Sequence, residues 1–323
     1  MLLTDYHTHS VLSPDGNVPL ARMADAAVAA GLGELCITDH CDLMDQDGGR
    51  VYGYNWPAAV SQFRETVPMF QGRLNLRLGL EFGVPHVDRT AAEQILSLPE
   101  LDFVIGSVHN LSPARGGRDF YFVDYPDADA CYAALDDYFA SMSVLACTDL
   151  YDVLGHIIYP LRYMHTPVSL ERYRETIRTI LRKVAEGGRG IEINTYRGRT
   201  IADWRPILEL YRDCGGEIVT VGSDAHLPEH VGLGISEACA LLQQTGFRYL
   251  ATASRNCTGC KEDMKHENCN GQRPRRLCAQ AASQDLSGEQ GLSGGRLRDG
   301  FHTELRLPRL RPFGGGGRGL RPV

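Results

Sequence analysis

Two histidines separated by one residue, His7 and His9, follow a short apolar start in the stretch DYHTHSVLSPDG, residues 5–16, and Asp15 stands a few residues on. Imidazole and carboxylate groups are common ligands of divalent transition metals. Residues i and i+2 of a β-strand point to the same side, so both imidazoles would face one point if this stretch is extended. A single pair among eleven histidines can arise by chance. Its meaning therefore depends on whether other ligands arrive in the same way.

Metal-type or polar side chains stand at the end of every further strand that the sequence predicts. These ends carry Asp39 and His40, then Glu81, His109, His156, Glu192 with Asn194, and finally Asp224 with His226. Parallel strands of a βα barrel present their carboxyl ends to one mouth, where active sites are built. A lone buried histidine is usually a hydrogen-bonded core residue. That explanation would have to apply independently at nearly every strand end, which is improbable. We therefore expect these groups to converge.

Alternating short apolar runs and longer helical stretches predict the elements that position these groups. Strands are expected at 2–6, 34–38, 76–81, 102–107, 152–156, 190–194 and 217–223, and helices at 19–31, 57–70, 89–97, 127–146, 169–186, 203–214 and 236–245. The clearest helix is 169–186, where apolar residues repeat at three and four, Ser169 can cap the start and Gly187 ends the pattern. Strands that alternate with helices predict an α/β fold with a parallel sheet.

Composition restricts the class of protein. The chain has 323 residues, 43% of them hydrophobic and 23% charged, which is ordinary for a soluble globular protein. Its net charge of −7 argues weakly against a nucleic-acid partner. The amino terminus has no signal-peptide pattern, and no apolar run approaches the ~20 residues of a membrane span. We expect a cytoplasmic protein without membrane contact, and the sequence leaves its oligomeric state open.

The last part of the chain differs in kind from the rest. Residues 257–323 hold 12 glycines and have 12 Lys and Arg against 7 Asp and Glu. Such a segment buries too little apolar surface to offset chain entropy, so we predict a domain at 1–256 and a disordered basic, Gly-rich tail at 257–323. A C-x2-C-x8-C-x8-C pattern begins at Cys257 and ends at Cys278. Its second half lacks the tight spacing of zinc sites, which disfavours zinc there. Whether this tail is functional or an aberrant gene end stays open.

The ligand types indicate the metals and the reaction. Imidazole with carboxylate and without cysteine suits Zn, Fe or Mn. Eight or nine ligands exceed the needs of one ion, so two or three divalent ions that share a carboxylate account for them better. Clustered dications are typical of phosphoester hydrolysis, because they activate water at neutral pH and stabilise charge on the phosphoryl oxygens.

The motifs HTHS with Asp15, TDH, GLEFG, GSVH, GH and GSDAH occur in this order over about residues 3–256. In this the chain resembles the PHP superfamily (polymerase and histidinol phosphatase). The stretches IEINTYRG and GGEIVTVGSDAHLPEHVG resemble its monofunctional histidinol-phosphatase branch. The resemblance implies a distorted (β/α)7 barrel with a trinuclear metal centre. It also implies hydrolysis of L-histidinol phosphate, a small phosphate ester, to histidinol and phosphate in histidine biosynthesis.

The resemblance also assigns residues to the metals. It implies that a first ion is held by His7, His9, Glu81 and Asp224, a second by Glu81, His109 and His156, and a third by Asp15, His40 and His226. Glu81, Asp224 and His226 are expected to be catalytic as well as ligating. A hydroxide that bridges the ions is the implied nucleophile.

Cationic side chains are expected to bind the phosphate. Arg162, in GHIIYPLRY, and Arg197, in NTYRGR, follow the fifth and sixth strands and resemble phosphate-contacting positions of this branch. A guanidinium binds phosphate oxygens in a bidentate manner, although any one arginine can equally be a surface charge. His230, four residues after His226, is a candidate substrate contact or a structural residue. Asp39 is a candidate for orienting an imidazole.

Other functions compete with this interpretation. A different PHP phosphoesterase would act on nucleotides, oligonucleotides or phosphotyrosine, but the acidic body and the lack of a basic, aromatic stripe disfavour nucleic acid. A non-catalytic PHP module would have lost ligands, whereas this set is complete. An amidohydrolase barrel would usually need a lysine or carboxylated bridging group, and no lysine stands at these strand ends.

Overall fold

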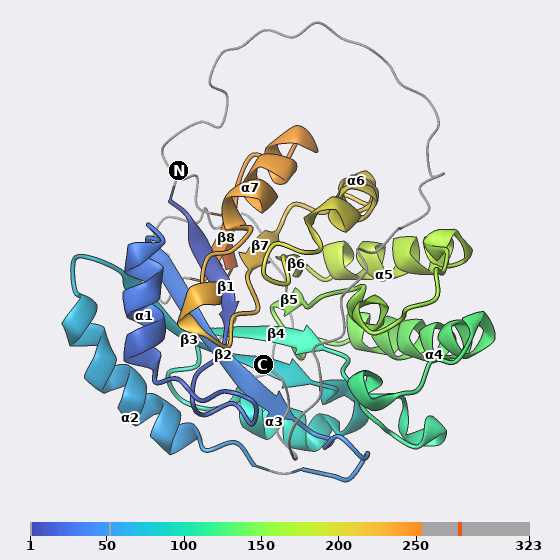
Figure 1. Ribbon diagram of the computed structural model, residues 1–323, viewed down its shortest axis with the longest axis horizontal. Coiled ribbons are helices and arrows are strands. Elements are labelled where there is room, and N and C mark those ends of the chain that lie inside the picture. The colour runs from blue at the N-terminus through green and yellow to red at the C-terminus, as the bar shows by residue number, and fades with distance from the viewer. Residues whose placement is uncertain (1, 52, 254–276, 280–323) are drawn as a thin grey trace, which may run out of the picture.

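The computed structural model describes residues 2–51, 53–253 and 277–279, and its main feature is a sheet of seven parallel strands in the order β1 to β7. The strands are β1 Thr4–Thr8, β2 Glu34–Asp42, β3 Asn75–Gly83, β4 Phe103–Ser107, β5 Val153–Leu154, β6 Gly190–Asn194 and β7 Val219–Gly222. All seven strands predicted from the sequence are present, and sequential order with parallel pairing is the arrangement of a βα barrel (Figure 1). The predicted fold class is confirmed: the strands form a nearly closed, distorted (β/α)7 barrel.

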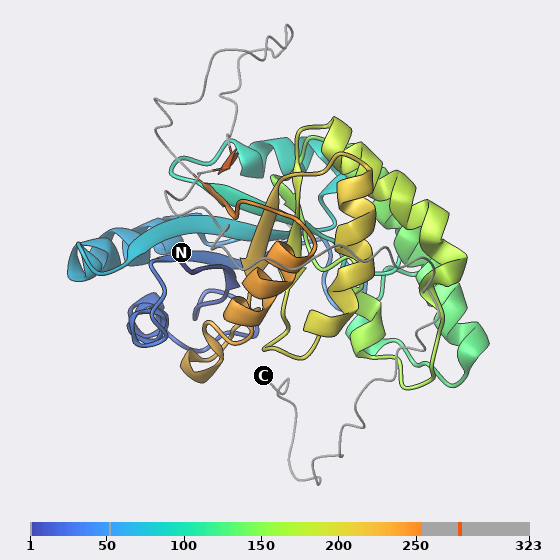
Figure 2. The same cartoon turned by 90° about the horizontal axis from the view of Figure 1, so that it is seen from above.

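Seven α-helices surround the sheet in the described part of the chain, each where the sequence predicts one. They are α1 Leu20–Ala29, α2 Trp56–Thr66, α3 Arg89–Leu96, α4 Ala128–Ala146, α5 Arg174–Glu186, α6 Trp204–Asp213 and α7 Ile235–Gln244. Figure 2 shows α4 and α5 on the opposite side of the barrel from α1 and α2. None of the described helices is long and apolar enough to cross a membrane.

Two predicted helices have a 3-10 turn at one end in place of α-helix. The one expected over 57–70 changes to a 3-10 turn at Val67–Phe70, where Pro68 lacks the N–H that an α-helix would use. The one expected over 169–186 begins with a 3-10 turn, Leu170–Tyr173, whose start is capped by the Ser169 side chain. The predicted apolar face of α5 is buried through Ile177, Ile180, Leu181 and Val184.

A bulge in β1 decides where its side chains point. Asp5 pairs with Leu35 but Thr8 pairs with Ile37, so three steps along β1 match two along β2. Bulges of this kind re-aim side chains and are common beside active sites. Tyr6 packs into an apolar cluster between the strands with Phe103, Ile105 and Val153, whereas the histidines on either side of Thr8 point to the mouth. The bulge was not predicted from the sequence.

The barrel closes between β1 and β7, which lie side by side (Figure 1). One parallel bridge joins Thr8 to Ala225, and the Asp224 amide donates to the His7 carbonyl at 2.9 Å. The Asp5 carboxylate extends this seam, because it accepts hydrogen bonds from the Ser223 amide and hydroxyl and from the Gly232 amide. Asp5 is wholly buried, and burial outweighs these bonds and raises its pKa. The ligands on the first and last strands are thereby held together.

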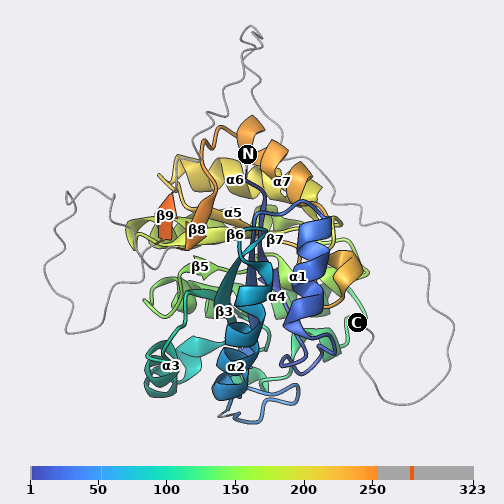
Figure 3. The same ribbon diagram turned by 90° about the vertical axis from the view of Figure 1, so that its left-hand side faces the viewer.

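A short strand, β8 Ala251–Ala253, covers the end of the barrel away from the mouth. The Ala253 amide donates to the Tyr6 hydroxyl at 2.7 Å, and that hydroxyl donates to Glu34, the first residue of β2. β8 pairs in antiparallel fashion with β9 Leu277–Ala279, inside the segment predicted to be disordered (Figure 3). The disordered tail at 257–323 stays a prediction. The rest of that segment, including Cys257, Cys260 and Cys269 of the cysteine pattern, lies outside the described residues.

Replacing Asp5 by alanine tests the seam. The Ser223 and Gly232 amides would lose their partner inside the protein, so Asp5→Ala is expected to lower the free energy of unfolding by about 2–4 kcal/mol. Urea denaturation of both proteins measures this difference. Asp25→Ala, an exposed position on α1, serves as the control and should change stability by less than about 0.5 kcal/mol. Equal stability of the two variants would contradict a role for Asp5 in closing the barrel.

Candidate metal centre

A buried carboxylate, Glu81 at the end of β3, is the centre of the site. Its Oε1 lies 2.6 Å from His156 Nε2 and 2.9 Å from His109 Nε2, and its Oε2 lies 3.0 Å from His7 Nε2. His40 Nδ1 lies 3.2 Å from the same Oε2. Only 1% of the Glu81 side chain is exposed. Strands β1 to β5 thus deliver their ligands to one carboxylate, as the sequence pattern predicts.

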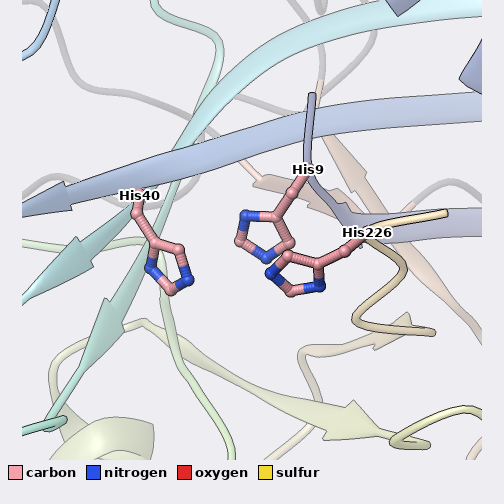
Figure 4. A group of neighbouring side chains, drawn as sticks. All are labelled: His9, His40 and His226. Atoms are coloured by element: carbon pink, nitrogen blue, oxygen red, sulfur yellow. The ribbon is translucent and has the colours of Figure 1, made fainter. Parts of the chain in front are cut away.

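Two further carboxylates extend the cluster. Asp224 Oδ1, just after β7, lies 3.5 Å from His9 Nε2. Asp15 Oδ2, in the loop after β1, lies 3.2 Å from His226 Nε2 and 3.7 Å from His40 Nε2. Figure 4 shows the imidazoles of His9, His40 and His226 side by side, and the His9 ring stacks on the His226 ring with centroids 4.0 Å apart. The structure brings together all nine residues predicted to ligate metal.

Hydrogen bonds at the far nitrogen fix how the rings point. His7 Nδ1 lies 2.6 Å from Glu192 Oε1, and His9 Nδ1 lies 3.0 Å from the Ser13 hydroxyl. The Nε2 atoms of His7, His9 and His226 are buried and make no hydrogen bond within the described residues. Buried imidazoles with one nitrogen held and the other directed at carboxylates are the arrangement of metal-ligating histidines.

The residues present fit divalent metal ions. Four groups have ligand atoms within 4.8 Å of one another: His7, His9 and Asp224; Glu81, His109 and His156; His9, His40 and His226; and His40, Asp42 and His109. The first two lie within the sets expected for the first and second ions. In the third, His9 stands where Asp15 was expected, although Asp15 contacts both of the other histidines. Imidazole nitrogen and carboxylate oxygen together suit Zn, Fe or Mn.

Electrostatics keep the carboxylates in the metal-binding form. Burial would raise the pKa of Glu81, but His7, His109 and His40 outweigh it and hold this pKa well below its usual range. The same balance, with His7 and Arg162 as the main opposing charges, lowers the pKa of Asp224. Burial, together with the neighbouring His226 and His40, lowers the pKa of His9 to about 3. Ionised carboxylates and neutral imidazoles are the protonation states that ligate metals. Against the effect of burial, the neighbouring carboxylates raise the pKa values of His7, His109 and His226, so metal binding would release protons from these imidazoles.

Asp42 was missed in the sequence. Its Oδ1 lies 2.8 Å from His109 Nδ1, on the ring opposite the nitrogen that faces Glu81. Gly83 on β3 makes room for it, since a Cβ there would lie 1.5 Å from Asp42 Oδ1. The available signal was its position two residues after His40, on the same face of β2. Asp42 therefore supports a ligand and is itself near enough to bind metal.

Three more polar residues at predicted strand ends, Asp39, Glu192 and Asn194, support the ligands. Asp39 accepts hydrogen bonds from the Ser13 hydroxyl at 3.1 Å and from Tyr54 at 3.0 Å, so it reaches His9 through Ser13 and not His40 directly. Glu192 holds His7, as described above. Asn194 donates to Asp224 Oδ2 at 3.2 Å. Both β6 side chains therefore face the site.

A cavity of about 420 Å³ opens at this mouth, and its lining includes Arg162 and Arg197. Arg162 Nη1 lies 2.8 Å from Asp224 Oδ2, and only 6% of its side chain is exposed. Its guanidinium lies 4.2 Å from the centroid of the Tyr196 ring. His230 is not among the described residues that line the cavity. Burial, then the charge of Arg197, lowers the pKa of His230.

The chain is similar to proteins of a known family. The model of the PHP domain matches residues 5–196. The chain belongs to the PHP family. Among curated relatives, the histidinol-phosphatase of Lactococcus lactis is 29% identical over 258 residues, which cover 77% of this chain and 94% of that protein. A probable histidinol-phosphatase of Thermotoga maritima is 27% identical over 268 residues, which cover 80% and 99%.

Solved structures support the same family. A histidinol phosphate phosphatase from Lactococcus lactis, complexed with zinc, L-histidinol and phosphate, superposes with a TM-score of 0.67 at 26% identity and covers 78% of this chain and 97% of that one. A putative histidinol phosphatase from Listeria monocytogenes has a TM-score of 0.61 at 19% identity, which shows the fold. The resemblance to the histidinol-phosphatase branch is thus confirmed.

Replacing Asp42 by asparagine tests its support of His109. The substitution removes the charge that holds His109 Nδ1, so metal affinity is expected to fall roughly 10–100-fold. Bound metal per chain, measured against a graded chelator, gives the affinity. Asp88→Asn is the matched control, because asparagine also caps α3 and Asp88 lies outside the cluster. A metal affinity of Asp42→Asn equal to that of the control would refute this role.

Proposed function

We propose that this chain hydrolyses L-histidinol phosphate to L-histidinol and phosphate in histidine biosynthesis. The observation that carries the proposal is a complete set of imidazole and carboxylate ligands beside two arginines at one cavity. Relatives named histidinol-phosphatase or probable histidinol-phosphatase, which align with this chain over nearly their whole length, support the proposal. We place the enzyme in the cytoplasm and expect no nucleic-acid or membrane partner.

Two or three divalent ions, Zn, Mn or Fe, would be held by the three ligand sets named above. When bound, such ions activate water at neutral pH and neutralise charge on the phosphoryl group. Glu81 lies between the first and second sets, so its two oxygens suit a bridging position. Asp224 and His226 follow β7 and belong to the first and third ligand sets, respectively. Together with Glu81 they are the proposed catalytic ligands.

The arginines would bind the phosphate. Arg162 is fixed between Asp224 and the Tyr196 ring, so little side-chain entropy remains to be lost on binding. Arg197 follows on the same turn as Tyr196 and lines the same cavity. Both guanidinium groups stabilise the additional charge of a phosphoryl transition state. His230, beside this turn but outside the cavity wall, remains a candidate for binding substrate.

The rest of the cavity suits the alcohol portion of this substrate. Its wall includes Asp45, Asp47 and Asp119 together with Tyr121 and Tyr163. Carboxylates and aromatic faces favour a cationic, ring-bearing group such as the amine and imidazole of histidinol. The further phosphates of a nucleotide or oligonucleotide would meet these carboxylates. This wall therefore favours histidinol phosphate over nucleotides and oligonucleotides.

Phosphate release tests the substrate. Full-length protein loaded with Mn or Zn is expected to hydrolyse L-histidinol phosphate at least about 100-fold faster, in kcat/KM, than a nucleoside monophosphate, a dinucleotide or phosphotyrosine. His9→Ala, which removes a ligand, should abolish the activity. Activity on the other esters alone would support phosphoester hydrolysis but reject histidinol phosphate as the substrate. No activity at full metal occupancy would favour a non-catalytic module.

Metal removal tests the ligand assignment independently of turnover. Ions that bind only the folded chain stabilise it, so a strong chelator is expected to lower the melting temperature by roughly 8–15 °C. Added Zn or Mn should restore it. Calorimetry of wild-type protein and His9→Ala, with and without chelator, measures the change. A wild-type melting temperature that changes neither with chelator nor with added metal would contradict the proposed metal centre.

A further inference from the structure

Asn194, the last residue of β6, connects a proposed metal ligand to a turn that carries an arginine. Its Nδ2 donates to Asp224 Oδ2 at 3.2 Å, and its Oδ1 accepts from the Tyr196 amide at 2.9 Å. The side chain is fully buried. Both ends of the Asn194 amide group are therefore used: Nδ2 bonds to Asp224, just after β7, and Oδ1 bonds to the turn after β6.

That turn has an unfavourable backbone conformation. Tyr196 and Arg197 follow one another with φ of 44° and 60°, in the left-handed region that side chains other than glycine rarely adopt. Asp224 has the same conformation at φ 59°. The Arg197 amide donates to the carbonyl of Ser223, the residue before Asp224, at 3.0 Å. Such conformations persist only where surrounding contacts hold them, and here the two turns hold each other.

Arg162 contacts both Asp224 and Tyr196, so these three residues and Asn194 form a closed ring of contacts. Its Nη1 donates to Asp224 Oδ2, the same oxygen that Asn194 contacts, and its guanidinium stacks on the Tyr196 ring. Asp224 Oδ2 is thereby occupied, while Oδ1 faces His9. A carboxylate held in this way can offer only one oxygen to a metal.

We propose that Asn194 is a positioning residue that fixes the Asp224 carboxylate toward the metal and sets the turn that presents Arg162 and Arg197 to phosphate. This inference rests on the proposed function. It predicts that one side chain, which contacts neither metal nor substrate, controls the affinity for both. No other described side chain contacts both Asp224 Oδ2 and the Tyr196 amide.

Two variants separate the two halves of this role. Asn194→Ala removes the hydrogen bonds to Asp224 and to the Tyr196 amide, and also a 3.3 Å contact between Asn194 Nδ2 and His7 Nδ1. Metal affinity is therefore expected to fall about tenfold or more, and affinity for inorganic phosphate about tenfold. Tyr196→Ala removes the ring that holds Arg162 but leaves the bond from Asn194 to Asp224. It should weaken phosphate binding alone, with metal affinity unchanged. Full-length, metal-loaded protein is measured with a graded chelator for metal and by calorimetry for inorganic phosphate.

Thr200→Val is the matched control. The Thr200 hydroxyl donates to the Asn194 carbonyl, which also accepts from Trp204 Nε1, so this variant removes a buried hydrogen bond in the same turn and leaves the Asn194 side chain in place. Melting temperatures report any general loss of structure. Metal and phosphate affinities that fall in Asn194→Ala but not in Thr200→Val support the proposal.

Other results would overturn it. If Asn194→Ala binds metal as tightly as wild type, or loses no more affinity than Thr200→Val, Asn194 is only structural. Those results leave the proposed function intact, because the wild type still binds metal and phosphate. If the wild type binds neither, the proposed function fails, and this inference fails with it.

Discussion

The structure depends on a buried carboxylate that faces five imidazole rings. Glu81 Oε1 lies within 3.5 Å of nitrogens of His109 and His156. Its Oε2 lies within 3.5 Å of nitrogens of His7, His9 and His40. Burying so many polar groups is unfavourable unless opposite charges and hydrogen bonds compensate for the lost water. Within the protein the compensation comes from neighbouring carboxylates such as Glu192, Asp42 and Asp224, which hold the rings in place. Divalent ions would complete it.

Local irregularities bring the ligands to this carboxylate. The bulge in β1 lets Tyr6 fill the barrel and still turns His7 and His9 to the mouth. The Asp5 carboxylate and a single backbone bridge then hold β1 against β7, which places Asp224 beside those histidines. Without this seam, His7 and His9 would lie farther from Asp224. Fold and site are thus established by the same few contacts.

The sequence predicted the parts of this arrangement that follow from local pattern. Strand and helix positions follow from apolar periodicity, and the convergence of ligands follows from their place at strand ends in a parallel sheet. The contacts of Asp5 with Ser223 span 218 residues, and no local pattern reports them. Asp42 was missed for the same reason, since its partner His109 lies after another strand. The short strands β8 and β9 carry too few residues to show a period.

Anomalous diffraction from crystals of the full-length protein grown with zinc, recorded above and below the zinc absorption edge, tests the central claim most directly. The account predicts peaks at the mouth, one among His7, His9 and Asp224 and one among Glu81, His109 and His156, with a third beside Asp15, His40 and His226 if three ions bind. Zinc bound only elsewhere, with these imidazoles hydrogen-bonded to one another or to water, would contradict the account, because the convergence of the strand ends would then serve the barrel and not a metal centre.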